Sequence, residues 1–227
     1  MALPKAKYPL TDIFVYSIDK KIPFRQFLVK EERLFESPDS DRHVLIKSIS
    51  DCITSCSLGK VDGTTLPIFD LQNIWIQLSK ISEISLPDWS FMCGECGEYH
   101  EQSISYDDFG FKLTEYHTDT LTLRDNLIVN MRYPTAGELF EFDKETIPYY
   151  DIAATCIDSV KVKGKTVENI SEEEKIEFIE TLTSAEFEII TLFFASMPVV
   201  QNVIEFECGN CGTENEVVMN GFFGESE

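Results

Sequence analysis

Two short cysteine motifs contain the residues of this chain that are best suited to chemistry. Residues 91–97 read F-M-C-G-E-C-G, and residues 206–212 repeat the pattern as F-E-C-G-N-C-G. In each copy an apolar, strand-like run leads into a C-G-x-C-G turn, whose glycines let backbone amides approach the sulfurs. Four thiolates in two such turns are the donor set of a closed structural zinc site. We therefore predict that one Zn²⁺ binds the two pairs, which are Cys93, Cys96, Cys208 and Cys211.

The two cysteine pairs are unusually far apart in the sequence. More than a hundred residues separate Cys93 from Cys208, whereas common zinc ribbons close over a much shorter loop. A shared zinc would therefore clamp the two ends of a long insertion. Each pair could instead be a redox motif or a disulfide. We favour zinc because neither pair opens a recognisable helix of a thioredoxin-like unit, and because no secretory leader is expected at the start of the chain.

The remaining cysteines are expected to be core residues. Leu45, Ile49, Cys52 and Cys56 recur at positions i, i+4, i+7 and i+11, which places them on one face of a helix. Metal binding by Cys52 and Cys56 is the alternative, but the apolar stripe explains both cysteines without a metal. Cys156 shares a predicted helix face in the same way.

The histidines and the familiar catalytic motifs give no sign of an enzyme. His43 lies among helix-capping residues, and His117 has no serine or cysteine partner close in sequence. His100 follows Cys96 by four positions and could replace a thiolate, although four cysteines already complete a zinc shell. The sequence has no H-E-x-x-H, P-loop, dinucleotide-binding or G-x-S-x-G motif. We predict that the protein is not an enzyme and takes no small-molecule substrate.

The charge of the chain points to protein partners. The 227 residues carry a formal net charge of −21, and 43% of them are hydrophobic, as in a globular protein. Such a surface repels nucleic-acid phosphates and anionic lipid, and no segment reaches transmembrane length. The alternative is a zinc-ribbon protein that binds nucleic acid as an accessory of transcription, but it would need a basic groove. We expect a location in a reducing cytoplasm.

The pattern of the chain predicts an α+β fold. Residues 8–29 are typical of a hairpin that turns at Asp19–Lys21, and a short helix follows to residue 35. A second helix is expected from caps at 39–41 to Gly59, and a third after Pro67. A further hairpin is predicted at 120–133, with its turn at 124–126.

The later part of the chain is expected to be mainly helical. Helices are predicted at 136–142 and 148–160, and 161–165 is a basic loop, read as a solvated turn or a partner contact. Ser171 with Glu174 and Thr183 with Glu186 have the spacing of capping boxes that open two more helices. The predicted domains are an N-terminal hairpin with helices, a split zinc ribbon, and an insertion made of a hairpin and helices. Their ranges are 1–83, 84–105 with 201–220, and 106–200.

Several segments resemble the baseplate hub proteins of T-even-type contractile-tailed bacteriophages. The similarity is clearest over residues 1–100, where the F-x-x-F-L-V-K-E-E run at 24–32 is the most specific part. The start M-A-L-P, the segment L-P-I-F-D-L at 66–71, the first C-x-x-C element and the step R-Y-P-T at 132–135 are also similar.

The resemblance implies a late phage protein that is needed to assemble the central hub of the tail baseplate. It would act with other hub and tape-measure proteins in the cytoplasm of the infected host, and either remain in the virion or leave as an assembly chaperone. The resemblance implies no active-site residues. The four zinc ligands are predicted from spacing alone.

Overall fold

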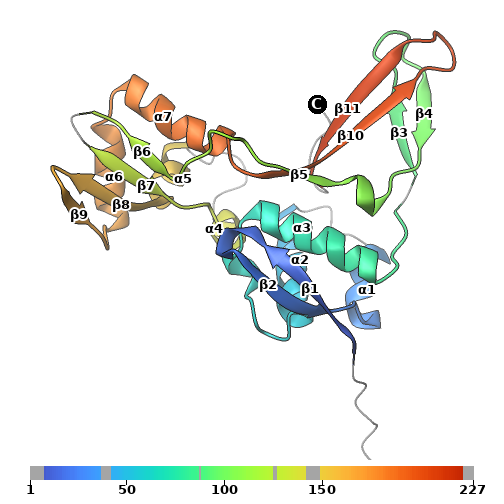
Figure 1. The fold of residues 1–227 in the computed structure, drawn as a ribbon, viewed down its shortest axis with the longest axis horizontal. Helices are drawn as coiled ribbons and strands as arrows, with labels where there is room; N and C mark the ends of the chain where they lie inside the picture. The colour runs from blue at the N-terminus through green and yellow to red at the C-terminus, as the bar shows by residue number, and fades with distance from the viewer. Residues whose placement is uncertain (1–7, 37–41, 87, 125–126, 142–148, 222–227) are drawn as a thin grey trace, which may run out of the picture. The chain divides into compact units, whose positions relative to one another are not determined.

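The computed structural model describes residues 8–36, 42–86, 88–124, 127–141 and 149–221 (Figure 1). The chain divides into two compact units, one made of residues 1–112 with 199–227 and the other of residues 113–198. We call them unit 1 and unit 2. Helices and small antiparallel sheets occur in both, which confirms the α+β class. The expected caps at 39–41 and most of the turn at 124–126 lie outside the described residues, as does the side chain of His43.

Unit 1 begins with the predicted hairpin. Strand β1 (Leu10–Val15) pairs antiparallel with β2 (Lys20–Arg25). The turn comes earlier than expected, as a 3₁₀ turn at Tyr16–Ile18 followed by Asp19 at φ 51°. Lys20 and Lys21 therefore belong to the strand, where they pair with Val15 and Phe14. The reason for the shift is a buried carboxylate elsewhere in unit 1 that binds the turn.

That carboxylate belongs to Asp70, in the first turn of helix α3 (Ile68–Ile81). Its side chain is fully buried and accepts hydrogen bonds from the amides of Tyr16 and Ser17, both at 2.8 Å. Burial raises the pKa of Asp70 above its ordinary value, although the two amides oppose this shift. Asp70 thus fixes the β1–β2 turn against α3.

We expect Asp70→Ala to lower the free energy of unfolding of unit 1 by about 2–3 kcal/mol, because two buried amides would lose their acceptor. Urea unfolding measures the change. Asp70→Asn is the matched control, since its carbonyl oxygen keeps one acceptor, and it should cost less. Equal stability of Asp70→Ala and wild type would show that the turn does not depend on this carboxylate.

The three predicted N-terminal helices are present. They are α1 (Val29–Glu36), α2 (Arg42–Cys56) and α3. The apolar stripe of α2 faces the core, and Cys52 and Cys56 are 4% and 0% exposed, which confirms them as buried residues. A 3₁₀ turn (Gly63–Thr65) follows α2 and lies against it. A Cβ at Gly63 would meet the Ser50 carbonyl oxygen at 2.3 Å, so only glycine fits there.

The rest of unit 1 consists of two antiparallel hairpins and one added strand. Strand β3 (Trp89–Met92) pairs with β4 (Tyr99–Gln102), and β10 (Val199–Glu207) pairs with β11 (Glu214–Asn220). Strand β5 (Gly110–Lys112), which follows a 3₁₀ turn (Tyr106–Asp108), pairs with the beginning of β10. Chain segments from before and after unit 2 therefore share one sheet.

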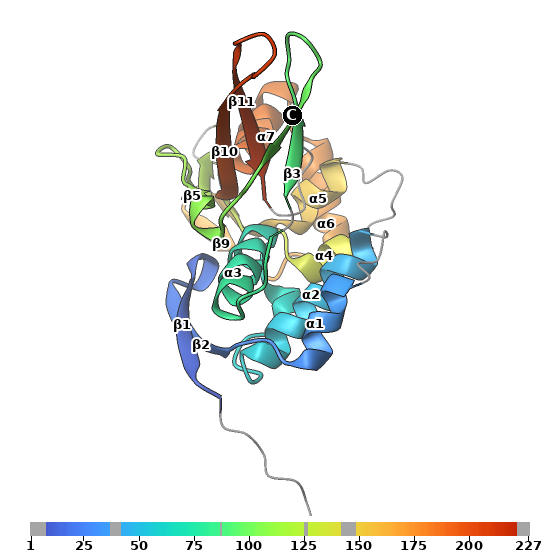
Figure 2. The same ribbon diagram turned by 90° about the vertical axis from the view of Figure 1, so that its right-hand side faces the viewer.

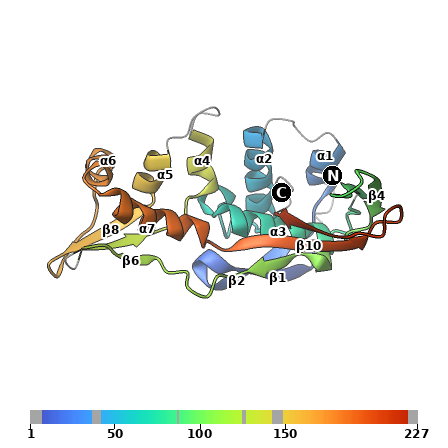
Figure 3. The ribbon, with the colours of Figure 1, turned by 90° about the horizontal axis from the view of Figure 1, so that it is seen from above.

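Unit 2 is a four-stranded antiparallel sheet with helices. The sheet order is β6 (Thr120–Thr122), β7 (Ile128–Met131), β8 (Ile157–Val162) and β9 (Lys165–Val167). Helices α5 (Tyr149–Thr155), α6 (Glu172–Glu180) and α7 (Ser184–Ala195) lie on one side of the sheet (Figure 3). The part of unit 2 that the structure describes also contains helix α4 (Ala136–Glu141). Val129, Ile157, Ile190 and Phe193 are among the residues of the shared core.

The helix predicted over 148–160 is wrong in its second half. Helix α5 ends at Thr155, and Ile157–Val162 is strand β8, which pairs with both β7 and β9. The β-branched residues in this stretch pack better in a sheet, and pairing with β7 overrides the helical spacing of Ile152, Cys156 and Val160. The predicted basic loop 161–165 is only partly a turn: Lys163 and Gly164 form it at positive φ, whereas the residues on either side belong to β8 and β9. Cys156 is fully buried, as predicted.

Both predicted capping boxes are present. The Ser171 hydroxyl accepts from the Glu174 amide while the Glu174 carboxylate accepts from the Ser171 amide, and Thr183 with Glu186 does the same for α7. Helix α7 is apolar on most sides. It buries Ile190 and Phe193 but leaves Leu192 57% exposed. Among the described residues, no helix is long and apolar enough to cross a membrane.

Candidate metal centre

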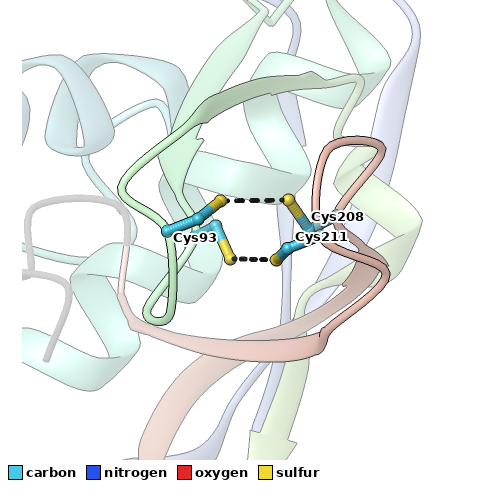
Figure 4. Close-up of side chains that lie close together, drawn as sticks. Cys93, Cys208 and Cys211 are labelled. Atoms are coloured by element: carbon cyan, nitrogen blue, oxygen red, sulfur yellow. Dashed lines mark hydrogen bonds between the residues drawn. The ribbon is translucent and has the colours of Figure 1, made fainter.

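The four predicted ligand residues lie together at the tips of two neighbouring hairpins. The β3–β4 and β10–β11 hairpins stand side by side with their turns at the same end (Figures 1 and 2). Their apolar faces share a small core of Phe91, Ile204, Phe206 and Met219. This core holds the two turns opposite one another, so that their sulfurs face each other (Figure 4).

The distances between the sulfurs suit a tetrahedral metal ion. All four Sγ atoms lie within 4.8 Å of one another, with Cys93–Cys211 at 3.7 Å and Cys96–Cys208 at 3.5 Å. Metal–sulfur bonds of about 2.3 Å in a regular tetrahedron give a sulfur–sulfur separation of about 3.8 Å. A disulfide requires about 2.05 Å, and all seven cysteines are free. The cluster could therefore hold one metal ion, with each turn contributing two ligands.

The two turns have the same backbone geometry. In the first, the Cys93 amide donates to the Glu98 carbonyl at 2.8 Å and the Gly97 amide donates to the Cys93 carbonyl at 3.0 Å. In the second, Cys208 and Gly212 make the equivalent bonds, each at 2.8 Å. Gly97 and Gly212 have φ values of 75° and 73°, a region that L side chains rarely adopt. The glycine after the second cysteine is thus required by the turn in both copies.

Polar side chains join the two turns independently of any metal. The Gly94 amide of the first turn donates to Asn215 Oδ1 of the second hairpin at 3.0 Å. The Asn210 amide group lies 3.6 Å from Cys96 Sγ. His100 Nε2 lies 3.2 Å from Cys208 Sγ, so this imidazole contacts the sulfur cluster from β4 beside the four cysteines. These contacts orient the sulfurs in advance of metal binding.

Backbone amides, burial and neighbouring thiols give Cys93 and Cys208 different proton affinities. Backbone amides of Cys96 and Glu95 lower the pKa of Cys93 to about 6. At Cys208 the amide of Cys211 acts in the same direction, but burial and the neighbouring thiols outweigh it and raise the pKa to about 11. Four thiolates so close together repel one another, and a divalent cation would remove that repulsion. Cys93 and Cys208 are buried, whereas Cys96 and Cys211 face the surface.

His117 has partners that the sequence did not reveal. Its Nδ1 lies 2.8 Å from Ser196 Oγ and its Nε2 lies 2.9 Å from the Tyr133 hydroxyl. The Ser196 hydroxyl also lies within hydrogen-bond distance of the Leu192 and Phe193 carbonyls, at 2.7 and 3.1 Å. The ring also stacks on Tyr133, and burial lowers the pKa of His117.

The surroundings of His117 indicate a packing role. Its imidazole joins the first residues of unit 2 to the end of β7 and to the C-terminal cap of α7. Ser196 is 79 positions away, so proximity in sequence could not have found it. An aromatic cluster with Phe193 completes the contact.

The comparisons with known proteins give one family. Residues 6–223 match the sequence model of the family described as T4 bacteriophage base plate protein. The chain therefore belongs to that family of phage tail baseplate proteins. No curated protein and no solved structure matches it. The resemblance expected from residues 1–100 is thereby confirmed, and the match extends over nearly the whole chain.

Proposed function

We propose that this protein is an assembly factor or subunit of the central hub of a phage tail baseplate, stabilised by a structural Zn²⁺. Membership in the base plate family over residues 6–223 is the observation that carries this proposal. The partners would be other hub proteins and the tape-measure protein. The protein would meet them in the cytoplasm of the infected host and would either stay in the tail or leave after assembly.

The metal in this proposal is zinc because the donor set consists of four thiolates. Cys93, Cys96, Cys208 and Cys211 would fill all positions of a tetrahedral ion, which leaves no open position for substrate or water. The ion would supply a cross-link between segments that are distant in sequence. Its role would be to hold the β3–β4 and β10–β11 hairpins together, and the protein would not be an enzyme.

The charge of the surface supports protein partners over nucleic acid. A net charge of −21 disfavours contact with phosphates and would keep a complex with a basic or apolar partner soluble. Binding to DNA in a gel-shift assay at low salt would argue for a nucleic-acid-binding accessory of late gene expression instead.

An affinity-tagged copy of the protein in infected cells tests the proposal. We expect mass spectrometry of the captured complexes to find hub or tape-measure proteins at a constant ratio to the tagged chain. Finished tails should then be assayed for the protein, because its presence there indicates a subunit and its absence indicates a factor that leaves. Capture of no baseplate protein would contradict the proposal.

Zinc binding is expected to release protons at pH 7. Cys208, whose pKa is about 11, is protonated at that pH and must lose its proton to bind a metal ion. The affinity should therefore fall as the pH is lowered. Calorimetric titration in buffers of different ionisation enthalpy measures the number of protons released. Binding without release would show that Cys208 does not coordinate the ion as a thiolate.

A further inference from the structure

Unit 2 contains an open groove that the metal centre does not use. It lies where the start of α5, the second half of α6 and the start of α7 meet, and its volume is about 500 Å³. Ile179, Leu182 and Phe187 contribute to its apolar surface. We call it the α6–α7 groove. Its volume lies in the range of sites that hold a ligand or a few large side chains of a partner.

Aromatic and aliphatic side chains stand exposed at the groove. Tyr150 is 60% exposed, although its ring lies 4.7 Å from the ring of Phe187, measured between centroids. Ile176 is 39% exposed on α6. Partly exposed aromatic rings beside an apolar hollow are typical of sites that receive a large side chain of a partner.

The charges around the groove are almost all negative. Glu173, Ile176, Glu177 and Glu180 are spaced at i, i+3, i+4 and i+7, so they form one exposed stripe of α6. Asp151 of α5 and Glu180 both line the groove. Helices α5, α6 and α7 together carry eight carboxylates, and Lys175 is their one basic residue.

Lys175 does not neutralise the negative charge that a partner in the groove would meet. Lys175 is only 8% exposed, and its ammonium group lies 2.8 Å from Glu172 Oε1. Glu186 of α7 is likewise paired, with Arg124 at 2.7 Å. Among the described residues, Asp151 and Glu180, the two carboxylates that line the apolar hollow, have no basic side chain within ion-pair distance.

We propose that the α6–α7 groove binds a basic amphipathic segment of another baseplate protein. The choice of a baseplate protein as the partner rests on the proposed function. A large apolar side chain of that segment enters between Tyr150, Ile176 and Phe187. Lysine or arginine residues beside it contact Asp151 and Glu180. A helix that lies in a groove commonly binds in this way, through apolar anchors at i, i+3 or i+4.

Charge complementarity favours a basic segment over the other possible occupants of the groove. A second copy of the chain would bring another surface of net negative charge against Asp151 and Glu180, and like charges across an interface are unfavourable. Nucleic acid is repelled for the same reason.

A photo-crosslink identifies the occupant directly. Benzoylphenylalanine in place of Ile176 should form, in infected cells, an adduct with a baseplate protein, and the crosslinked peptide should contain lysine or arginine beside an apolar residue. The same replacement at Asp158, an exposed site on β8, is the control and should not mark that peptide. An adduct with a second copy of this chain, with an acidic peptide, or with no baseplate protein would overturn the inference.

Charge reversal measures the contribution of the carboxylates. We expect Asp151→Lys with Glu180→Lys to weaken binding to the crosslinked partner at least about tenfold. Asp158→Lys with Glu168→Lys makes the same charge change on exposed residues of unit 2 and should leave the affinity within about twofold. Circular dichroism checks that both variants fold.

The outcomes separate this inference from the proposed function. If the wild-type protein captures baseplate proteins and the groove variants capture them equally well, the groove is not the docking site and the proposed function stands. If the wild-type protein captures none, both fail.

Discussion

Replacing Cys93 with serine is expected to abolish stoichiometric zinc binding and to release the β3–β4 and β10–β11 hairpins. Structural zinc contributes roughly 10 kcal/mol or more in small zinc domains, and three thiolates hold the ion far less tightly than four. The hairpins share only a small apolar cluster, so most of their mutual stability would depend on the metal. Elemental analysis, together with limited proteolysis of residues 84–105 and 201–220, measures both effects.

The choice of variant matters because His100 contacts the cluster. His100 Nε2 lies 3.2 Å from Cys208 Sγ and could take the place of that thiolate in Cys208→Ser. Cys93→Ser is therefore the cleaner test. Cys156→Ala is the matched control. Cys156 is fully buried in the core of unit 2, so its replacement should leave the metal content unchanged. Full zinc occupancy in Cys93→Ser would show that the two pairs do not share an ion.

Replacing Arg25 with alanine is expected to lower the free energy of unfolding by about 3 kcal/mol, because the buried Glu31 carboxylate then keeps only the exposed Lys30, 3.1 Å away, as a charged partner. The side chains of Arg25 and Glu31 are each 5% exposed and lie 2.9 Å apart. Arg25 also donates to Ser55 at 2.9 Å and lies 3.4 Å from Cys56 Sγ. The pair thus joins β2 to both α1 and α2.

The double variant Arg25→Met with Glu31→Leu is the control for this effect. Removing both charges together should cost much less than Arg25→Ala, because no buried charge remains and Lys30 is exposed to water. Chemical denaturation of the single and double variants gives the comparison. A loss in the double variant as large as in Arg25→Ala would mean that the shape of the arginine matters more than the ion pair.

The same pair makes stability depend on pH. Burial by itself raises the pKa of Glu31, but hydrogen bonds from Arg25 and the Leu28 amide outweigh burial and hold the pKa below its ordinary value of 4.5. The folded state therefore binds the proton less tightly than the unfolded state. The stabilisation from Glu31 is present above about pH 4.5 and is lost as the pH falls through the lowered pKa. Wild type should lose more stability on acidification than the double variant.

Patterns within a few residues of sequence are sufficient to predict some features of this structure but not others. The four cysteines could be found because each turn repeats the same glycine spacing, which reflects the backbone geometry of residues within a few positions. The stripe that contains Cys52 and Cys56 and the capping boxes at Ser171 and Thr183 are likewise local.

Features that depend on distant pairing were missed. The helical spacing of Ile152, Cys156 and Val160 favours a helix through β8, because it does not reveal the pairing of this strand with the distant β7. His117 contacts Ser196 only through the fold. The turn of the first hairpin moved because Asp70, more than fifty positions away, binds its amides. The α6–α7 groove is formed by residues of three helices, so no single segment of the sequence indicates it.

Unit 2 is inserted between strands β5 and β10, and this insertion delays completion of the four-cysteine cluster during synthesis on the ribosome. Cys93 and Cys96 emerge more than a hundred residues before Cys208 and Cys211, which corresponds to roughly 6–20 s of synthesis. Unit 2 is continuous in sequence and emerges complete within that interval. The two early thiols must therefore wait, as half of a metal-binding set, until all of unit 2 and strand β10 have been translated.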